Sequence, residues 1–170
     1  MSSDERRRVI DGPHPGEQPT AQLVAADVRC DGDAPTVLGR CREAMAAVLE
    51  HADGRWRSDE QWRELLPAWF VAVSAPDKTP EQIREHWARR EAMTPEQRRA
   101  LDAEQDQRWS VGGWVSNFDP GEREWAWWSA EVIGSDQFRV LILADTWPVP
   151  VGPLDWLLRA AGGREIEIDI

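Results

Sequence analysis

The residue types that carry out catalysis or bind metals do not occur at spacings that would let them act together. The three histidines, His14, His51 and His86, lie far apart, and no HExxH or CxxC motif is present, so no metal site is expected. GxSxG, SxxK and glycine-rich phosphate loops are also missing. Cys41 and His51 would lie about 15 Å apart along one helix, too far for a hydrogen bond. Because these motifs are absent, the sequence predicts no catalytic residue and no cofactor.

Glu131 and Asp145 form the pair of carboxylates that best fits an acid–base role. They lie toward the ends of neighbouring predicted strands. In a groove lined with tryptophan, such a pair could catalyse sugar hydrolysis. The alternative is two solvated charges at the edge of a sheet. We favour this alternative because nothing else in the sequence marks either carboxyl group as perturbed.

Tryptophan is the most informative residue type, because six of the eleven tryptophans lie between Trp109 and Trp147. We expect 108–118 and 124–133 to be strands, since both are rich in residues that favour strands. Asp119-Pro120-Gly121 between them is a typical turn sequence. The two segments are therefore predicted to form a hairpin.

In this hairpin three tryptophans would share one face, with Trp114 opposite Trp127 and diagonal to Trp125. Their neighbours on that face are small or polar, Glu131 among them. An exposed face would make a stacking platform or a partner hot spot. If a preceding helix covers this face instead, the three rings belong to the core. We favour burial, but both alternatives stay open. Trp147, in the proline-rich link after the next strand, is a second candidate for exposure.

Hydrophobic periodicity predicts helices through most of the chain before residue 107. Apolar residues recur at helical spacing over 36–52 and again over 58–73, where Pro67 should kink or break the helix. Thr79 and Thr94 are each followed by Pro-Glu-Gln, which places a capping residue and a first-turn proline at two further helix starts. The helices are expected to cover the sheet.

The third predicted strand, 138–145, is apolar on both faces and should be central in the sheet. A helix opened by Gly152-Pro153 follows, and 165–170 alternates acids with isoleucine as a half-buried strand does. The predicted fold class is α+β, with an N-terminal helical layer packed on a mainly antiparallel sheet of about four strands and a βαβ-like C-terminal unit. The expected division is a disordered tail over 1–20 and a single domain over 21–170, mostly helical over 21–107 and sheet-forming over 108–170.

The chain is acidic, with 31 acidic against 20 basic residues and a formal net charge of −11. An acidic field repels nucleic-acid phosphates and speeds encounter with basic proteins, so we expect a basic protein partner and no nucleic acid. No apolar run is long enough to span a membrane, and none follows Arg6-Arg7-Arg8 as in a signal peptide. Cys30 and Cys41 make no disulfide framework. A cytoplasmic protein from an arginine-rich bacterial proteome is expected, of unknown oligomeric state.

These features predict a non-enzymatic, acidic protein-interaction domain that holds a basic partner on its tryptophan face. The residues expected at this site are Trp114, Trp125, Trp127, Glu131 and Trp147. An immunity or antitoxin-type inhibitor is the concrete form, because it needs acidity and rigidity but no catalytic machinery. The alternative is a small-ligand or carbohydrate-binding domain with a tryptophan-lined site, hydrolytic through the pair Glu131 and Asp145. Self-association through the same face is a third alternative.

Overall fold

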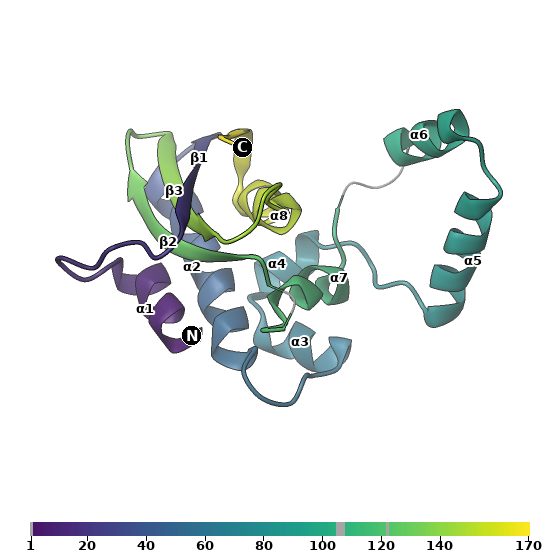
Figure 1. The fold of residues 1–170 in the computed structure, drawn as a ribbon, viewed down its shortest axis with the longest axis horizontal. Helices are drawn as coiled ribbons and strands as arrows, with labels where there is room; N and C mark the ends of the chain where they lie inside the picture. Colours follow the sequence, from purple (N-terminus) through teal and green to yellow (C-terminus); the bar gives the residue numbers. More distant parts are fainter. Residues whose placement is uncertain (1, 105–107, 122) are drawn as a thin grey trace.

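The structure is a computed structural model that describes residues 2–104, 108–121 and 123–170. Its elements follow one another along the chain (Figure 1) as α1 (Ser2–Asp11), β1 (Gln22–Cys30), α2 (Ala34–His51), α3 (Asp59–Leu65), α4 (Ala68–Val73), α5 (Pro80–Glu91), α6 (Pro95–Glu104), α7 (Val111–Val115), the 3-10 helix η1 (Ser116–Phe118), β2 (Trp125–Val132), β3 (Gln137–Ala144), α8 (Gly152–Ala161) and β4 (Gly163–Ile168). Within the described ranges, no helix has the length and apolar character needed to cross a membrane.

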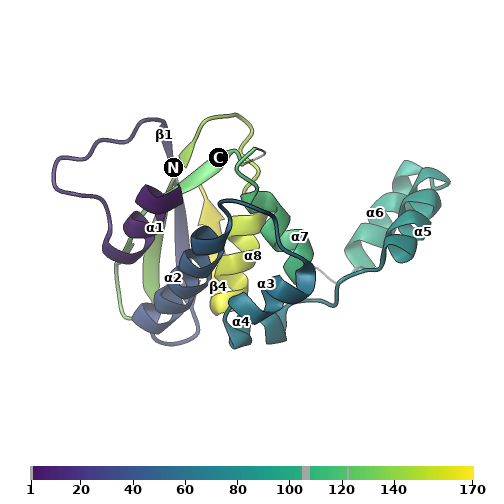
Figure 2. The ribbon, with the colours of Figure 1, turned by 90° about the horizontal axis from the view of Figure 1, so that it is seen from below.

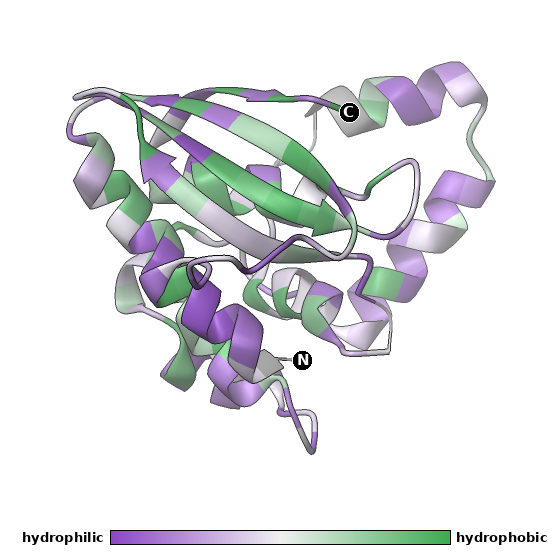
Figure 3. Cartoon of the chain, turned by 60° about the vertical axis from the view of Figure 1, so that its left-hand side comes forward, coloured by the Kyte–Doolittle hydropathy of each residue, from purple (hydrophilic) through white to green (hydrophobic). Residues whose placement is uncertain are grey.

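The four strands form one antiparallel sheet in the order β2-β3-β1-β4. This confirms the predicted α+β fold and the central position of β3. Because β3 and β4 each run antiparallel to β1, they are parallel to each other, and α8 joins them in the predicted βαβ-like unit with β1 between its strands. The helices that pack on the sheet share one face (Figure 2). Figure 3 looks onto the opposite, open face, which no described helix covers.

Local hydrogen bonds explain where several helices begin and end. Ser58 and Gln61 bond each other's backbone reciprocally at the start of α3, and Thr79 and Gln82 do the same at the start of α5. Pro67 separates α3 from α4, because proline has no N–H to donate and its ring crowds the preceding turn. The predicted helix break at Pro67 is confirmed.

Residues 2–11 form a helix and not the expected disordered tail. α1 places Glu5 and Val9 one turn apart on the same side, and both are buried, with 3% and 0% of their surface exposed. The glycines and prolines that suggested disorder begin only at Gly12, after the helix has ended. The composition typical of disorder therefore belongs to the loop that follows α1 and not to the helix itself.

Residues 108–118 contain helices where a strand was expected. The structure has α7 and η1 here, and the Ser110 side chain caps α7 by accepting a hydrogen bond from a backbone N–H of its first turn. The buried apolar residues recur at i, i+3, i+4 and i+7, which is the spacing of one helical face. These residues are Val111, Trp114, Val115 and Phe118. The first predicted hairpin therefore does not form, and β2 pairs with β3 alone.

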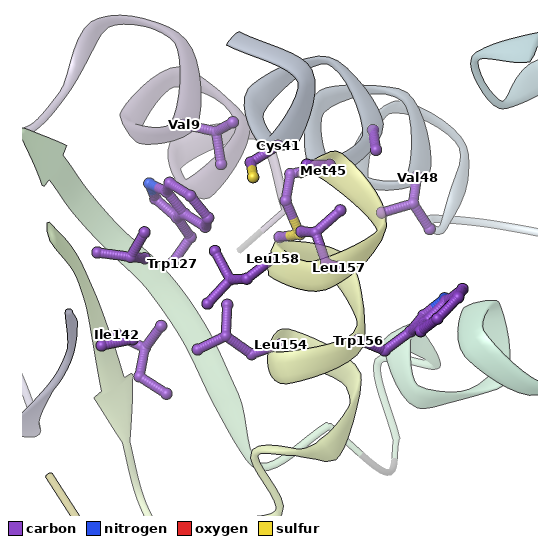
Figure 4. Packing of buried hydrophobic residues seen from close by; sticks show 14 of the residues in the cluster. Val9, Cys41, Met45, Val48, Trp127, Ile142, Leu154, Trp156, Leu157 and Leu158 are labelled. Atoms are coloured by element: carbon purple, nitrogen blue, oxygen red, sulfur yellow. The ribbon is translucent and has the colours of Figure 1, made fainter. Parts of the chain in front are cut away.

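The main core lies between the sheet and helices α2 and α8. Figure 4 shows Leu154 and Leu158 of α8 pointing toward Trp127 and Ile142 of the sheet. Met45 of α2 lies beside them, and all five side chains have 0% of their surface exposed. Burial on this scale, at roughly 25 cal/mol per Å² of apolar surface, makes this layer the main source of stability.

A buried carboxylate joins α1 to an irregular point on the edge of the sheet. The register of β2 shifts between Trp127 and Ser129, which marks a bulge. Glu5 accepts a hydrogen bond from the Trp127 N–H at 2.6 Å and binds the Arg123 guanidinium through both oxygens, at 2.5 and 2.6 Å. The bidentate pair compensates the buried charge, and the N–H left free by the bulge is satisfied.

Two further side chains bond the outer backbone of β2. Arg8 of α1 donates to the Trp127 carbonyl at 3.4 Å, and its guanidinium lies 5.2 Å from the ring centre of Trp128. Arg42 of α2 donates to the Ala130 carbonyl at 3.1 Å. Since side chains take these outward groups, the β2 edge is closed to another strand.

Removing the Glu5 carboxylate should destabilise the fold strongly. Glu5→Ala leaves Arg123, whose side chain is only 12% exposed, without its buried partner. We expect the free energy of unfolding in urea to fall by about 3–5 kcal/mol. Glu50→Ala is the matched control, since Glu50 of α2 binds Arg6 of α1 at the surface. This variant should lower the free energy of unfolding by about 0–1 kcal/mol. Equal losses in the two variants would contradict the role assigned to Glu5.

Candidate functional site

The three tryptophans of the predicted binding face belong to the core. Trp114 and Trp127 have 0% of their surface exposed and Trp125 has 4%. Trp114 comes from α7, its ring centre lies 4.5 Å from that of Phe70, and its indole N–H donates to the Pro153 carbonyl at 3.0 Å. Of the two alternatives for these rings, burial is the one the structure shows, and the exposed platform is wrong.

Glu131 and Asp145 do not form a carboxylate pair. Glu131 lies opposite Arg139 on the open face of the sheet, and Asp145 follows the far end of β3. Arg139 and Asp145 are six residues apart along an extended chain, which is roughly 20 Å. That separation is too large for two groups acting on one bond. Glu131 and Trp127 also project from opposite faces, because Trp127 pairs with the buried Ile142.

Trp147 lies in the link between β3 and α8 with 61% of its surface exposed. Val149, two residues later, is 4% exposed and anchors the link to the body. Trp147 therefore remains a candidate contact residue, although the tryptophans expected to accompany it, Trp125 and Trp127 among them, are buried.

A cleft of about 920 Å³ lies between the body of the protein and the start of α5. Two tryptophans, Trp56 and Trp109, and two carboxylates, Asp59 and Asp77, line it, and Ile83 of α5 lies on its other side. The volume is in the range of clefts that hold a small ligand or several side chains of a partner. It combines aromatic surface with acidic groups, so we take it as the candidate site.

Gly112 brings the two carboxylates of the cleft together. Its N–H donates to the Asp77 Oδ1 atom at 3.0 Å, and Arg63 binds the other oxygen at 2.5 Å. Asp59 lies against the Cα of Gly112, where an added Cβ would come within 2.7 Å of the Asp59 Oδ1 atom. Burial raises the pKa of Asp59, the charges of Asp77 and Glu60 raise it further, and Arg63 lowers it. Asp77 is thus anchored, whereas Asp59 has no hydrogen-bond or ion-pair partner among the described residues.

Segments distant in sequence assemble this cleft. The two carboxylates come from the start of α3 and from the segment after α4. The Ala75 N–H donates to the Trp109 carbonyl at 2.9 Å, and Ala75 and Ser110 form an isolated parallel bridge that holds this segment against the start of α7. Sequence reasoning missed the site because its parts are distant in sequence and meet through long-range contacts, namely this bridge and the bonds of Asp77 to Gly112 and Arg63. The glycine at position 112 is required because a side chain there would collide with Asp59, but only the fold shows this.

Helices α5 and α6, called the arm below, extend away from the body (Figures 1 and 2). Ile83 and Trp87 lie one turn apart on α5 with 43% and 58% of their surface exposed. Arg98 of α6 donates to the carbonyls of Arg90 and Glu91 at 2.8 and 3.4 Å, which ties α6 to the end of α5. Because Ile83 also lines the cleft, the exposed apolar side of α5 continues the cleft wall.

Metal and thiol chemistry find no support in the described residues. None of their His, Cys, Asp and Glu side chains gather in a group of three or more that could hold a metal ion. Cys30 and Cys41 are free and buried. Burial raises the pKa of Cys41 to about 12, and burial with the nearby charge of Asp136 raises the pKa of Cys30. Neither thiol is a nucleophile near neutral pH.

The two cysteines should resist alkylation in the folded protein. At pH 8 we expect iodoacetamide to label neither Cys30 nor Cys41, because both thiols are buried and protonated. In denaturant both should react, and mass spectrometry of the intact chain counts the labels. Rapid labelling of Cys41 in the folded protein would show that the packing of α2 against α8 is wrong.

Comparison with known proteins gives no functional information on this chain. No protein-family model matches the sequence, and no curated protein or solved structure matches it. The cleft and the exposed side of the arm are accordingly the features from which a function is inferred.

Proposed function

We propose that this protein is a non-enzymatic, acidic interaction domain that binds a basic protein, acting as an immunity or antitoxin-type inhibitor in a bacterial cytoplasm. The observation that carries the proposal is the exposed apolar side of the arm, Ile83 and Trp87, beside a cleft that is lined with tryptophan and holds the carboxylate of Asp59. The contact surface is therefore placed on the arm and the cleft, and not on the buried tryptophans expected from the sequence.

The arm supplies the apolar part of the proposed contact. Trp87 is 58% exposed on a helix that is well capped at its start, so its exposure does not follow from a frayed element. Tryptophan is among the residues most enriched in interface hot spots, since one ring buries a large apolar area at little cost in side-chain entropy. Ile83, one turn earlier, widens the same apolar strip toward the cleft.

The cleft supplies the charged part of the contact. Asp59 makes no ion pair among the described residues. Burial and the charges of Asp77 and Glu60 raise its pKa despite the opposing charge of Arg63, so a further cation from the partner would stabilise its ionised form. Trp56 and Trp109 offer ring surface on which a lysine or arginine can lie. Lys78 and Arg108 line the same cleft, which favours one inserted basic side chain over a long basic stretch.

Affinity capture from the host lysate, followed by affinity measurements with the purified partner, tests this function. We expect a stoichiometric basic protein whose binding weakens as salt rises. Trp87→Ala should weaken binding by at least about thirtyfold, the effect of losing a hot spot worth about 2 kcal/mol. Val132→Ala is the control: Val132 is 46% exposed on β2, away from the arm, and its loss should leave affinity unchanged.

Two outcomes would contradict the proposed contact surface. Capture of no basic protein would remove the leading function. An affinity that falls in Trp147→Ala and not in Trp87→Ala would move the contact to the link between β3 and α8. Circular dichroism of each variant shows that a loss of binding is not a loss of fold.

The cleft also supports a second candidate, a small-ligand or carbohydrate-binding domain with hydrolytic activity. Asp59 and Asp77 contact the same glycine, and their environments differ. Arg63 and a backbone N–H bind the Asp77 carboxylate, which suits a base or nucleophile, while the raised pKa of Asp59 suits a proton donor. Trp56 and Trp109 would stack on sugar rings. These residues replace the pair expected at Glu131 and Asp145.

A panel of soluble oligosaccharides and chromogenic glycosides tests the second candidate. Binding should change the tryptophan fluorescence, and any hydrolysis should be lost in both Asp59→Asn and Asp77→Asn. Glu131→Gln is the matched control and should keep full activity, because Glu131 lies on the open face of the sheet and outside the cleft. A flat fluorescence response across the panel would remove this candidate.

A further inference from the structure

The two edge strands of the sheet, β2 and β4, differ in whether side chains from the rest of the molecule bond their outward backbone groups. Along β2, side chains of Glu5, Arg8 and Arg42 bond backbone groups that point away from the sheet. β4, at the other edge, has β1 as its one neighbouring strand, and its helix-facing side chains, Ile166 and Ile168, are half-buried. No described helix runs along its outer side (Figure 3).

The register of β4 shows which backbone groups point outward. Asp169 donates its N–H to the Ala25 carbonyl at 3.0 Å, and Glu167 lies opposite Asp27 in β1. Bonding alternates along an antiparallel pair, so the N–H and carbonyl groups of Glu167 point toward β1 and those of Ile166 and Ile168 point outward. The Ile168 carbonyl accepts from the Ile170 N–H at 3.0 Å. No hydrogen bond from the described residues reaches the outward N–H groups of Ile166 and Ile168.

The acids of β4 share the open face, and their charge is incompletely balanced. Arg139 binds Asp27 through both oxygens, at 2.7 and 2.8 Å. Glu167 lies directly opposite Asp27 and has no ion pair within the described part of the chain. Like charges directly opposite one another on a sheet are unfavourable. The row of charges across the sheet thus ends at β4 with an acid that lacks a cation.

A hollow of about 320 Å³ on the open face adjoins this unbalanced acid. Glu165 and Glu167 of β4 line it together with Arg29 and Arg139 of the inner strands. Arg29 already pairs with Glu165, at 3.4 Å, and Arg139 with Asp27. The charge that remains beside β4 is therefore negative.

We propose that β4 receives an extended basic segment of the partner protein as a fifth strand, with a lysine or arginine opposite Glu167. Backbone hydrogen bonds to Ile166 and Ile168 would hold the segment, and alternate basic side chains would lie over the open face. This inference rests on the proposed function, since the segment belongs to the basic partner. A second copy of the chain does not fit, because pairing β4 with β4 would place acids against acids.

A blocked peptide of alternating lysine and valine tests the inference on the full-length protein. We expect measurable affinity by calorimetry and slower amide hydrogen exchange at Ile166 and Ile168 when the peptide is bound. The same peptide N-methylated on alternate residues, so that it cannot donate to the strand edge, should bind at least about tenfold more weakly. A peptide of alternating glutamate and valine should not bind.

Charge-reversal variants locate the contact. Glu167→Lys should weaken the lysine peptide about tenfold, because it turns an attractive pair into a repulsive one, and should allow the glutamate peptide to bind. Asp53→Lys makes the same change in net charge in the exposed loop after α2 and should alter either affinity less than about twofold.

Several results would overturn the inference. Binding that survives N-methylation, or that Glu167→Lys and Asp53→Lys reduce equally, would show attraction by net charge alone. A dimer in sedimentation that is lost on Glu167→Lys would show a second copy as the occupant. If the captured partner binds through the arm while no peptide protects Ile166 or Ile168, the inference fails and the proposed function stands. If the peptide protects Ile166 and Ile168 but no basic protein is captured, β4 accepts a basic strand and the proposed function fails.

Discussion

The carboxylate of Glu5 is the interaction on which much of the arrangement depends. It binds Arg123 just before β2 and the Trp127 N–H at the bulge, so one side chain fixes both the docking of α1 and the course of the strand. With α1 held there, Val9 completes the core and Arg8 reaches the Trp127 carbonyl. The same contact closes one edge of the sheet. It follows that the asymmetry between the two edges originates in a helix far from β4.

Tryptophan serves packing in this protein more than recognition. The chain has eleven tryptophans, three phenylalanines and no tyrosine, so indole rings take positions that smaller aromatic rings could fill. This use has a cost, because the indole nitrogens of Trp62, Trp127 and Trp156 are buried without a hydrogen-bond partner in the described structure. Trp114 avoids it through the Pro153 carbonyl. Recognition is left to Trp87, which is exposed, and to Trp56 and Trp109, which pack against the core on one side and line the cleft on the other.

How much of the fold is predictable from sequence depends on whether a local pattern fixes one answer. Helix starts at threonine-proline pairs, the break at Pro67 and the buried central strand β3 follow from local chemistry, and all are found. Val111 and Val115, four residues apart, fit both a strand and a helix, and the burial of Trp114 and Phe118 on the same side shows that the period is helical. The cleft was not predictable, since Asp59 and Gly112 are distant in sequence and meet only in the folded chain, where the bridge between Ala75 and Ser110 holds the start of α7.

The bridge between Ala75 and Ser110 sets the segment that enters the arm beside the segment that leaves it. In topological terms the arm is an insertion, and the body closes at this bridge without it. The described side chains of α5 and α6 add nothing to the buried core, so these two helices are free of the packing constraints that fix the body. A chain organised in this way can change its recognition element in length or composition while the folding unit stays the same.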